Sequence, residues 1–137
     1  MQRFIKAQND TYSTALKEIK LGKKQTHWMW FIFPQIKGLG RSDMAKYYAI
    51  KDKREAIRYL NHPILGFRLK EITEALLNLP TGDAEKVLGC VDSIKLKSSM
   101  TLFAMAANEK NSVFVKVLDK YYDGEPCRET LRLLGIK

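Results

Sequence analysis

Apolar side chains recur every three or four residues along most of the chain, which is the spacing of one face of an α-helix. The first such segment runs from Phe4 to Ile19, and Gly22 follows it at a position where glycine commonly ends a helix. A longer segment lies between Pro63 and Pro80, because proline suits the first turn of a helix and cannot continue one. The same spacing predicts further helices over residues 42–50, 52–60, 83–88, 92–107 and 126–134, and one from Val113 that Gly124 ends.

Short polar residues stand where several of these helices would begin. A serine, threonine, aspartate or asparagine side chain at such a position accepts a hydrogen bond from a backbone N–H group of the first turn. We therefore expect helix caps at Ser42, Asp52, Asp83 and Asp92.

The pattern does not predict a β-sheet. The chain lacks runs in which apolar and polar residues alternate, and it lacks Asn-Gly or Asp-Gly turns between two β-branched runs. It also shows no repeat of fixed period and no low-complexity linker. We therefore predict one compact all-α domain over residues 1–137, with about seven or eight short helices and no significant sheet.

Composition and charge narrow the class of protein. Apolar residues make up 45% and charged residues 28% of the 137 residues, which is typical of a globular domain and excludes a disordered chain. The net charge is +9, which favours anionic partners. Basic residues are nevertheless scattered and interleaved with glutamates, whereas nucleic-acid-binding proteins more often gather them on one element. The charge therefore predicts a basic solvated surface, and nucleic acid is not the favoured partner.

The chain carries no recognisable targeting or membrane segment. Charged residues interrupt residues 1–24, and the apolar run Trp28–Phe33 is too short to cross a bilayer. Its two cysteines, Cys90 and Cys127, form no CxxC pair and have no histidine cluster beside them. We therefore expect a cytoplasmic protein with two free thiols, no membrane contact, no metal site and no cofactor.

The stretch HWMWFIFPQ, residues 27–35, holds both tryptophans of the chain. If Thr26 caps a helix that begins at His27, bulky side chains lie on every side of that helix. A helix of this kind must be buried. We therefore expect most of the stretch to lie in the core, chiefly Met29, Phe31, Ile32 and Phe33.

Four residues of the same stretch bring polar atoms that need partners: His27, Trp28, Trp30 and Gln35. Either these atoms are satisfied inside the protein, or His27 and at least one tryptophan reach the edge of a cleft. In a cleft, an indole face can stack on a base or a cation, and the imidazole can bind a ligand or carry a proton. The pattern leaves both interpretations open.

Two further segments, GLGRS at 38–42 and KLKSSMTLF at 95–103, complete a resemblance to a known family. Together with HWMWFIFPQ they resemble the bacterial and fungal family called domain of unknown function 1810. The resemblance extends from QRF at 2–4 to TLRLLG at 130–135. It implies a mainly helical fold and no established activity. Genome labels sometimes call such proteins calpastatin, but that inhibitor is disordered, whereas this chain has the pattern of a packed core.

Both of these segments carry polar groups that suit an anion. Backbone amides at the start of a helix attract anions, and the guanidinium of Arg41 beside Ser42 would strengthen such a site. GLGRS is neither a Walker loop nor a GxGxxG motif, so by itself it is typical of a connecting loop. Lys95, Ser98 and Ser99 fall on neighbouring turns, where they would suit a phosphate or carboxylate. Because residues 98–107 carry no charge, the hydroxyls can instead be buried and bonded to carbonyls one turn earlier.

We predict a cytoplasmic helical protein that binds a small anionic ligand, such as a nucleotide or a derivative, in a pocket formed by the three segments. The alternative is a protein- or nucleic-acid-interaction module that acts through the basic surface. An enzyme that uses His27 as acid or base beside Lys95 or Arg41 also stays open, with no catalytic residue assigned. The expected ligand-binding residues are His27, Trp28, Trp30, Gln35, Arg41, Ser42, Lys95, Ser98 and Ser99.

Overall fold

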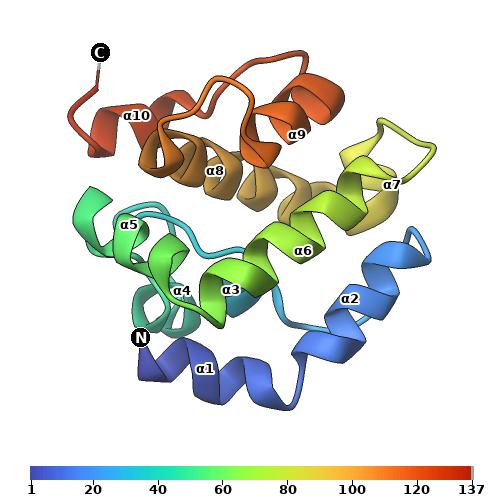
Figure 1. Cartoon of the computed structure of the whole chain (residues 1–137), viewed down its shortest axis with the longest axis horizontal. Helices are drawn as coiled ribbons and strands as arrows, with labels where there is room; N and C mark the ends of the chain where they lie inside the picture. Colours follow the sequence, from blue (N-terminus) through green and yellow to red (C-terminus); the bar gives the residue numbers. More distant parts are fainter. Residues whose placement is uncertain (137) are drawn as a thin grey trace.

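Ten helices cover most of the described chain, residues 1–136, in the computed structural model (Figure 1). Helices account for 64% of the chain, and the extended pairing within residues 1–136 is a single parallel bridge between Ile36 and Ile50. The all-α prediction is therefore confirmed, with ten helices in place of the expected seven or eight. None of the ten described helices has both the length and the apolar character of a membrane span. In chain order they are α1 (Gln2–Asn9), α2 (Tyr12–Lys20), α3 (Met29–Ile32), α4 (Asp43–Tyr47), α5 (Lys53–Asn61), α6 (Leu65–Leu77), α7 (Ala84–Leu88), α8 (Cys90–Ala107), α9 (Val113–Tyr122) and α10 (Arg128–Leu133).

The first predicted helix is two helices, because the chain turns at Asp10 and Thr11. Asp10 ends α1, and Thr11, with a φ of −123°, precedes α2. Aspartate and asparagine favour turns over helix interiors, because their side chains compete for backbone hydrogen bonds. The turn lets α1 pack against α3 while α2 packs against α6. Figure 1 shows the two helices meeting at an angle.

Three of the four expected helix caps form. The side chains of Ser42, Asp52 and Asp83 accept hydrogen bonds from backbone N–H groups in the first turns of α4, α5 and α7. The expectation for Asp92 is wrong, because α8 begins at Cys90, directly after its cap residue Gly89. Asp92 therefore lies inside the first turn of α8, where the helix dipole favours a carboxylate.

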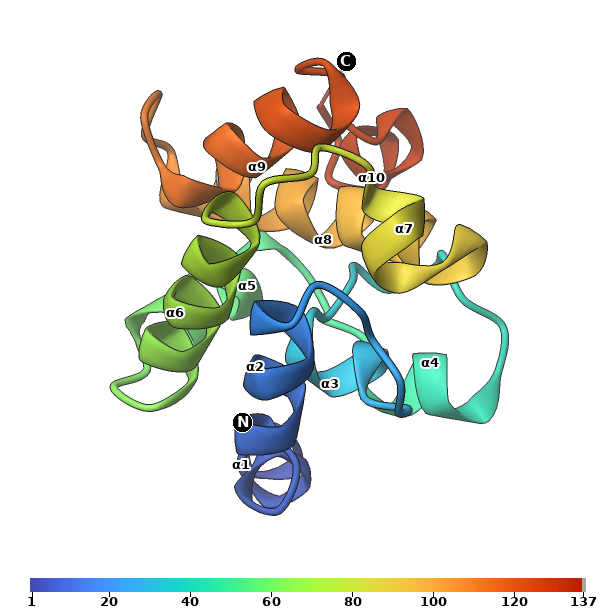
Figure 2. The same cartoon turned by 90° about the vertical axis from the view of Figure 1, so that its right-hand side faces the viewer.

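The centre of the fold is α8. It packs against α5, α7, α9 and α10, and both Figure 1 and Figure 2 show it beneath α9 and α10. Every residue from Ser98 to Ala104 is buried, as the absence of charge in this stretch predicts. Leu96, Met100 and Phe103 are completely removed from solvent. Burial of one such side chain contributes about 1.5–3 kcal/mol, so each of these three residues stabilises the fold by an amount of this order.

A row of aromatic side chains joins the N-terminal helix to the C-terminal half of the molecule. Phe4 meets Tyr59 edge-on with ring centroids 5.1 Å apart. The Tyr59 ring lies 5.3 Å from that of Phe103, which lies 5.8 Å from that of Phe114. The Gln8 amide donates a hydrogen bond of 2.9 Å to the Tyr59 hydroxyl, so this buried oxygen has a partner. One continuous core therefore connects α1, α5, α8 and α9.

The start of α6 lies in close contact with the end of α5. A Cβ atom at Gly66 would lie 2.0 Å from the carbonyl oxygen of Leu60, so a larger residue cannot fit without moving the backbone. From this contact onward, α6 buries the face that its sequence predicts, which consists of Leu65, Leu69, Ile72 and Leu76.

Candidate functional site

The aromatic stretch forms one short helix, α3, which covers only Met29–Ile32. The expected helix from His27 under a Thr26 cap is therefore wrong. Trp28 occupies the position before the first turn, and the Thr26 hydroxyl donates a hydrogen bond to Glu18. The apolar residues of the stretch are buried, as predicted: Met29, Phe31, Ile32 and Phe33.

Glu18, on α2, holds the segment that leads into α3. Its carboxylate accepts hydrogen bonds from the backbone N–H groups of Gln25 at 2.7 Å and Thr26 at 3.0 Å, and from the Thr26 hydroxyl at 2.7 Å. The indole N–H of Trp28 is a further donor, at 3.0 Å. Burial of Glu18 acts to raise its pKa, but these hydrogen bonds favour the charged form and lower the pKa to about 2. Glu18 is therefore charged at neutral pH, and its hydrogen bonds hold residues 25–28 against α2.

Asp92, on the central helix α8, pairs with Lys24 in the segment before α3 and with Lys95, which contacts Trp30. Its carboxylate lies 2.9 Å from Lys24 Nζ and 3.4 Å from Lys95 Nζ. Lys95 Nζ lies 4.8 Å from the ring centroid of Trp30, and Lys24 Nζ lies 5.0 Å from that of Trp28. Each indole therefore contacts a cation, and one carboxylate pairs with both cations.

Trp30 lines a small hollow of about 60 Å³, which we call the Trp30 hollow. Gln35 lines it from the segment between α3 and α4. Lys37 from the same segment and Lys46 from α4 also line it. None of the lining residues carries a carboxyl group. The others are Ile36, Gly38, Gly40, Ala45, Tyr48 and Ala49.

Backbone contacts fix the loop that carries Gln35 and Lys37. The Ile50 N–H donates to the Gln35 carbonyl, and the Lys37 N–H donates to the Ile50 carbonyl, each at 2.8 Å. Further along this loop, a Cβ atom on Gly40 would lie 2.3 Å from the Cβ atom of Ala45. Glycine at this position therefore lets the loop pack directly on α4. The loop that forms this side of the hollow is therefore held by Ile50 near Gln35 and by Ala45 near Gly40.

The Trp30 hollow brings together part of the expected ligand-binding set. Trp30 and Gln35 line it, and Lys95 contacts the Trp30 ring. Trp28 is fully buried, with its indole N–H donated to Glu18, so its ring does not reach a ligand on the surface. Of the two tryptophans, Trp30 is the one that lines this hollow.

Three other expected residues are exposed and do not line the hollow: His27, Arg41 and Ser42. The Ser42 hydroxyl accepts a hydrogen bond of 3.1 Å from the Ala45 N–H, so it serves as the cap of α4. The structure therefore does not gather His27 and Arg41 around this hollow.

The two serines of the KLKSS segment lie inside the protein, away from the Trp30 hollow. The Ser98 hydroxyl donates to the Ile94 carbonyl at 3.3 Å, as predicted for a buried hydroxyl, and lies 3.3 Å from Cys127 Sγ. The Ser99 hydroxyl is fully buried and has no hydrogen-bond partner within residues 1–136. Ser98 contacts the start of α10, and Ser99 is buried one turn beyond Lys95, so neither serine lines the Trp30 hollow.

Both cysteines are free thiols, as predicted. Burial acts to raise the pKa of the Cys127 thiol, but hydrogen bonds from Ser98 and from the start of α10 outweigh it, so the pKa lies below its usual value. Among residues 1–136, no three histidine, cysteine, aspartate or glutamate side chains are grouped to hold a metal ion.

Several residues that shape this region were not among those expected from the sequence. The sequence did contain a sign that Glu18 is buried, because it lies next to Ile19 and three residues after Ala15, on the same face of α2. No signal in the sequence indicates that Lys37 and Lys46 line the same hollow, because this depends on how the loop before α4 packs against that helix.

Comparisons with known proteins agree with this fold. A family model described as "Protein of unknown function (DUF1810)" matches residues 1–134. The chain is also similar to a solved structure, the crystal structure of the conserved hypothetical protein Rv1873 from Mycobacterium tuberculosis. The two sequences are 43% identical, the alignment covers 99% of this chain and 96% of that one, and the TM-score is 0.95. A search of curated proteins found no match.

Proposed function

The chain belongs to the DUF1810 family of proteins of unknown function, and we propose that it binds a small anionic ligand in the Trp30 hollow. A phosphate or carboxylate group of the ligand would lie near Lys37 and Lys46, with the Gln35 amide as a hydrogen-bond donor. The volume of about 60 Å³ suits such a group and excludes a whole nucleotide. The rest of the ligand would lie outside the hollow, against the accessible edge of Trp30.

The distribution of charge carries this proposal. The Trp30 hollow is lined by two lysines and no carboxyl group. In a larger hollow between α6 and α9 the two lysines are accompanied by Glu74 and Glu109, and another hollow beside α7 combines two basic with three acidic residues. A hollow on α2 has Lys17 and Lys20 without a carboxylate, but its lining offers neither an aromatic ring nor a side-chain amide. Like charges 4 Å apart near a protein surface repel by about 4 kcal/mol, so an anion is favoured where carboxylates are absent.

Lys95 has a positioning role in this proposal. Its ammonium group contacts the Trp30 ring and is paired with Asp92, so part of its charge is already compensated. It therefore holds the indole in place more than it attracts the ligand.

Calorimetric titration with sodium phosphate tests the proposal. The double variant Lys37→Met/Lys46→Met should bind phosphate roughly tenfold more weakly than the wild type, because two charges at up to about 1 kcal/mol each are lost. The matched control is Lys6→Met/Lys53→Met, which removes the same charge from exposed positions on α1 and α5. Its affinity for phosphate should match that of the wild type. An equal loss in both double variants would show that net charge alone attracts the anion, and would contradict the site.

The same variants separate this proposal from an interaction module that acts through the basic surface. Binding of a single-stranded oligonucleotide through distributed lysines should weaken steeply with salt. If the oligonucleotide binds in this way and both double variants weaken it equally, the interaction module replaces the proposal.

A further inference from the structure

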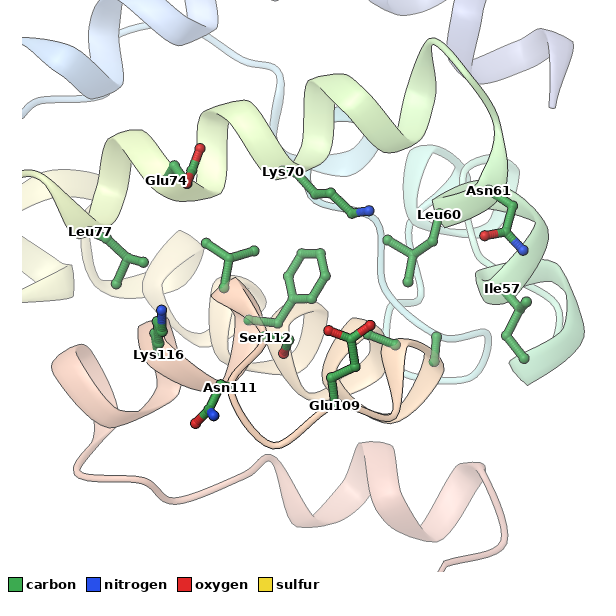
Figure 3. A pocket seen from close by; sticks show the side chains of 14 residues that line it. Ile57, Leu60, Asn61, Lys70, Glu74, Leu77, Glu109, Asn111, Ser112 and Lys116 are labelled. Carbon is green, nitrogen blue, oxygen red and sulfur yellow. The ribbon is translucent and has the colours of Figure 1, made fainter.

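A second and larger hollow, of about 630 Å³, lies between α5, α6, the end of α8 and the start of α9 (Figure 3). We call it the α6–α9 groove. Apolar side chains line it, among them Leu60, Leu77 and Phe114. Sites for small molecules commonly have volumes of about 300–1,000 Å³ and combine apolar walls with a few polar groups. The groove has the size and the lining of such a site.

Two side chains of each charge also line this groove. Figure 3 shows Lys70 and Glu74 on α6, with Glu109 and Lys116 on the opposite side. Each end of the groove therefore carries one positive and one negative side chain, Lys70 and Glu109 at one end and Glu74 and Lys116 at the other. None of the four takes part in a salt bridge within residues 1–136. Their charges are available to pair with a ligand.

We infer that the α6–α9 groove binds a zwitterion with an apolar body, namely an α-amino acid with a large apolar side chain. Its carboxylate pairs with Lys70, and its ammonium group pairs with Glu109. Its side chain lies along the apolar lining toward Phe114. This site shares no residue with the Trp30 hollow and does not depend on the function proposed there.

Charge complementarity selects this class of ligand over simpler ones. An anion would approach Glu74 or Glu109 at either end of the groove, and a cation would approach Lys70 or Lys116. A neutral apolar ligand would cover charged side chains without giving them partners, which is costly. A zwitterion gives each charge at one end of the groove an opposite partner while its body covers the apolar surface.

Nuclear magnetic resonance titration of the full ¹⁵N-labelled chain with L-leucine and L-phenylalanine tests the inference. Saturable shifts are expected at backbone amides around Lys70 and Phe114, with the Trp30 indole resonance unmoved. Lys70→Met and Glu109→Gln should each weaken binding about tenfold, which is the effect of losing one charged hydrogen bond. Lys86→Met and Glu85→Gln are the matched controls, because they make the same changes at exposed positions on α7. Both controls should bind like the wild type.

A blocked ligand provides the decisive comparison. N-acetyl-L-leucinamide keeps the apolar side chain but lacks both charges, so it should bind at least about tenfold more weakly than L-leucine. Equal binding of the two compounds would overturn the inference, as would shifts confined to other parts of the chain or no saturable shift with either amino acid.

Discussion

At the scale of single residues, the surroundings of Trp28 show how a buried carboxylate can stabilise a fold. Glu18 accepts hydrogen bonds from two backbone N–H groups, from the Thr26 hydroxyl and from the Trp28 indole. A buried charge is costly when it is unpaired, but charged hydrogen bonds of this number offset that cost. The carboxylate thereby fixes the course of the segment that leads into α3.

Glu18→Gln should lower the free energy of unfolding at neutral pH by about 2 kcal/mol, because a neutral amide is a weaker acceptor and brings unwanted donors. The pKa of Glu18 falls from an ordinary 4.5 to about 2 in the folded protein. Its contribution is therefore complete above pH 4.5 and is lost as the pH falls toward 2. Urea unfolding of both proteins, from neutral pH downward, should show their difference in stability shrinking over this window.

Glu85→Gln is the control for this experiment, because Glu85 is exposed in the first turn of α7. It should change the free energy of unfolding by no more than about 0.5 kcal/mol. A difference between wild type and Glu18→Gln that stays constant down to low pH would contradict the role given to the carboxylate.

The sequence could predict the apolar core of the aromatic stretch but not the separate roles of its tryptophans. Met29 and Phe33 are buried whichever way the stretch folds, because they have no polar side-chain atoms to satisfy. Trp28 and Trp30 differ because one indole meets Glu18, ten residues earlier in the chain, while the other faces α4 and Lys95. A helix of four residues has too few turns for periodicity to tell its faces apart.

At the scale of helices, the junction between α5 and α6 depends on Gly66. Alanine is favoured over glycine inside a helix by about 1 kcal/mol, so propensity alone predicts that Gly66→Ala is stabilising. The clash of its Cβ atom with the Leu60 carbonyl, at 2.0 Å, acts against this, because a backbone atom cannot move aside cheaply. Overpacking of this kind costs about 1–3 kcal/mol, and strain at a backbone atom lies at the upper end.

Gly66→Ala should therefore lower the free energy of unfolding by about 1–2 kcal/mol after the gain in propensity, as measured by urea unfolding. Phe67→Ala is the neighbouring control, because the Phe67 side chain is 64% exposed. Its effect should stay within about 0.5 kcal/mol. A Gly66→Ala protein as stable as the wild type would show that the two helices can separate without cost.

Local features of the helices were predictable, and features set by packing were not. The caps at Ser42, Asp52 and Asp83 depend on side chains within the same turn, so the sequence identifies them. The turn at Asp10 lies within a continuous apolar spacing, and it arises because α1 and α2 pack against different helices. The start of α8 lies two residues before Asp92, whose carboxylate pairs with Lys24 and Lys95 instead of capping the helix.

At the scale of the whole molecule, the packing around α8 decides which segments meet. The sequence predicted one pocket built from three segments, because Lys95, Ser98 and Ser99 are close along a helix. Helices pack on several sides of α8, so even residues on neighbouring turns can contact different elements. Lys95 meets Trp30, while Ser98 meets Cys127 at the start of α10. Residues of HWMWFIFPQ and GLGRS therefore line the Trp30 hollow, whereas KLKSSMTLF contributes only the contact between Lys95 and the Trp30 ring.

The net charge of +9 is spread over the surface, so it does not by itself identify a site. The Trp30 hollow differs from the α6–α9 groove and the hollow beside α7 because its lining has lysines without carboxylates. The hollow on α2, with Lys17 and Lys20, shares this property but has no aromatic ring in its lining. The Trp30 hollow also differs in holding a tryptophan that is only partly buried, which provides a reporter at the site itself.

The most direct test of the Trp30 hollow is the ¹H–¹⁵N spectrum of the two tryptophan indole groups during titration with sodium phosphate. Trp30→Phe assigns the resonances by removing one of them, and sodium chloride at equal ionic strength controls for screening. The indole resonance of Trp30 should shift and saturate with phosphate, while that of the buried Trp28 stays in place. If neither resonance moves, or if chloride moves that of Trp30 as far as phosphate does, the hollow is not an anion site.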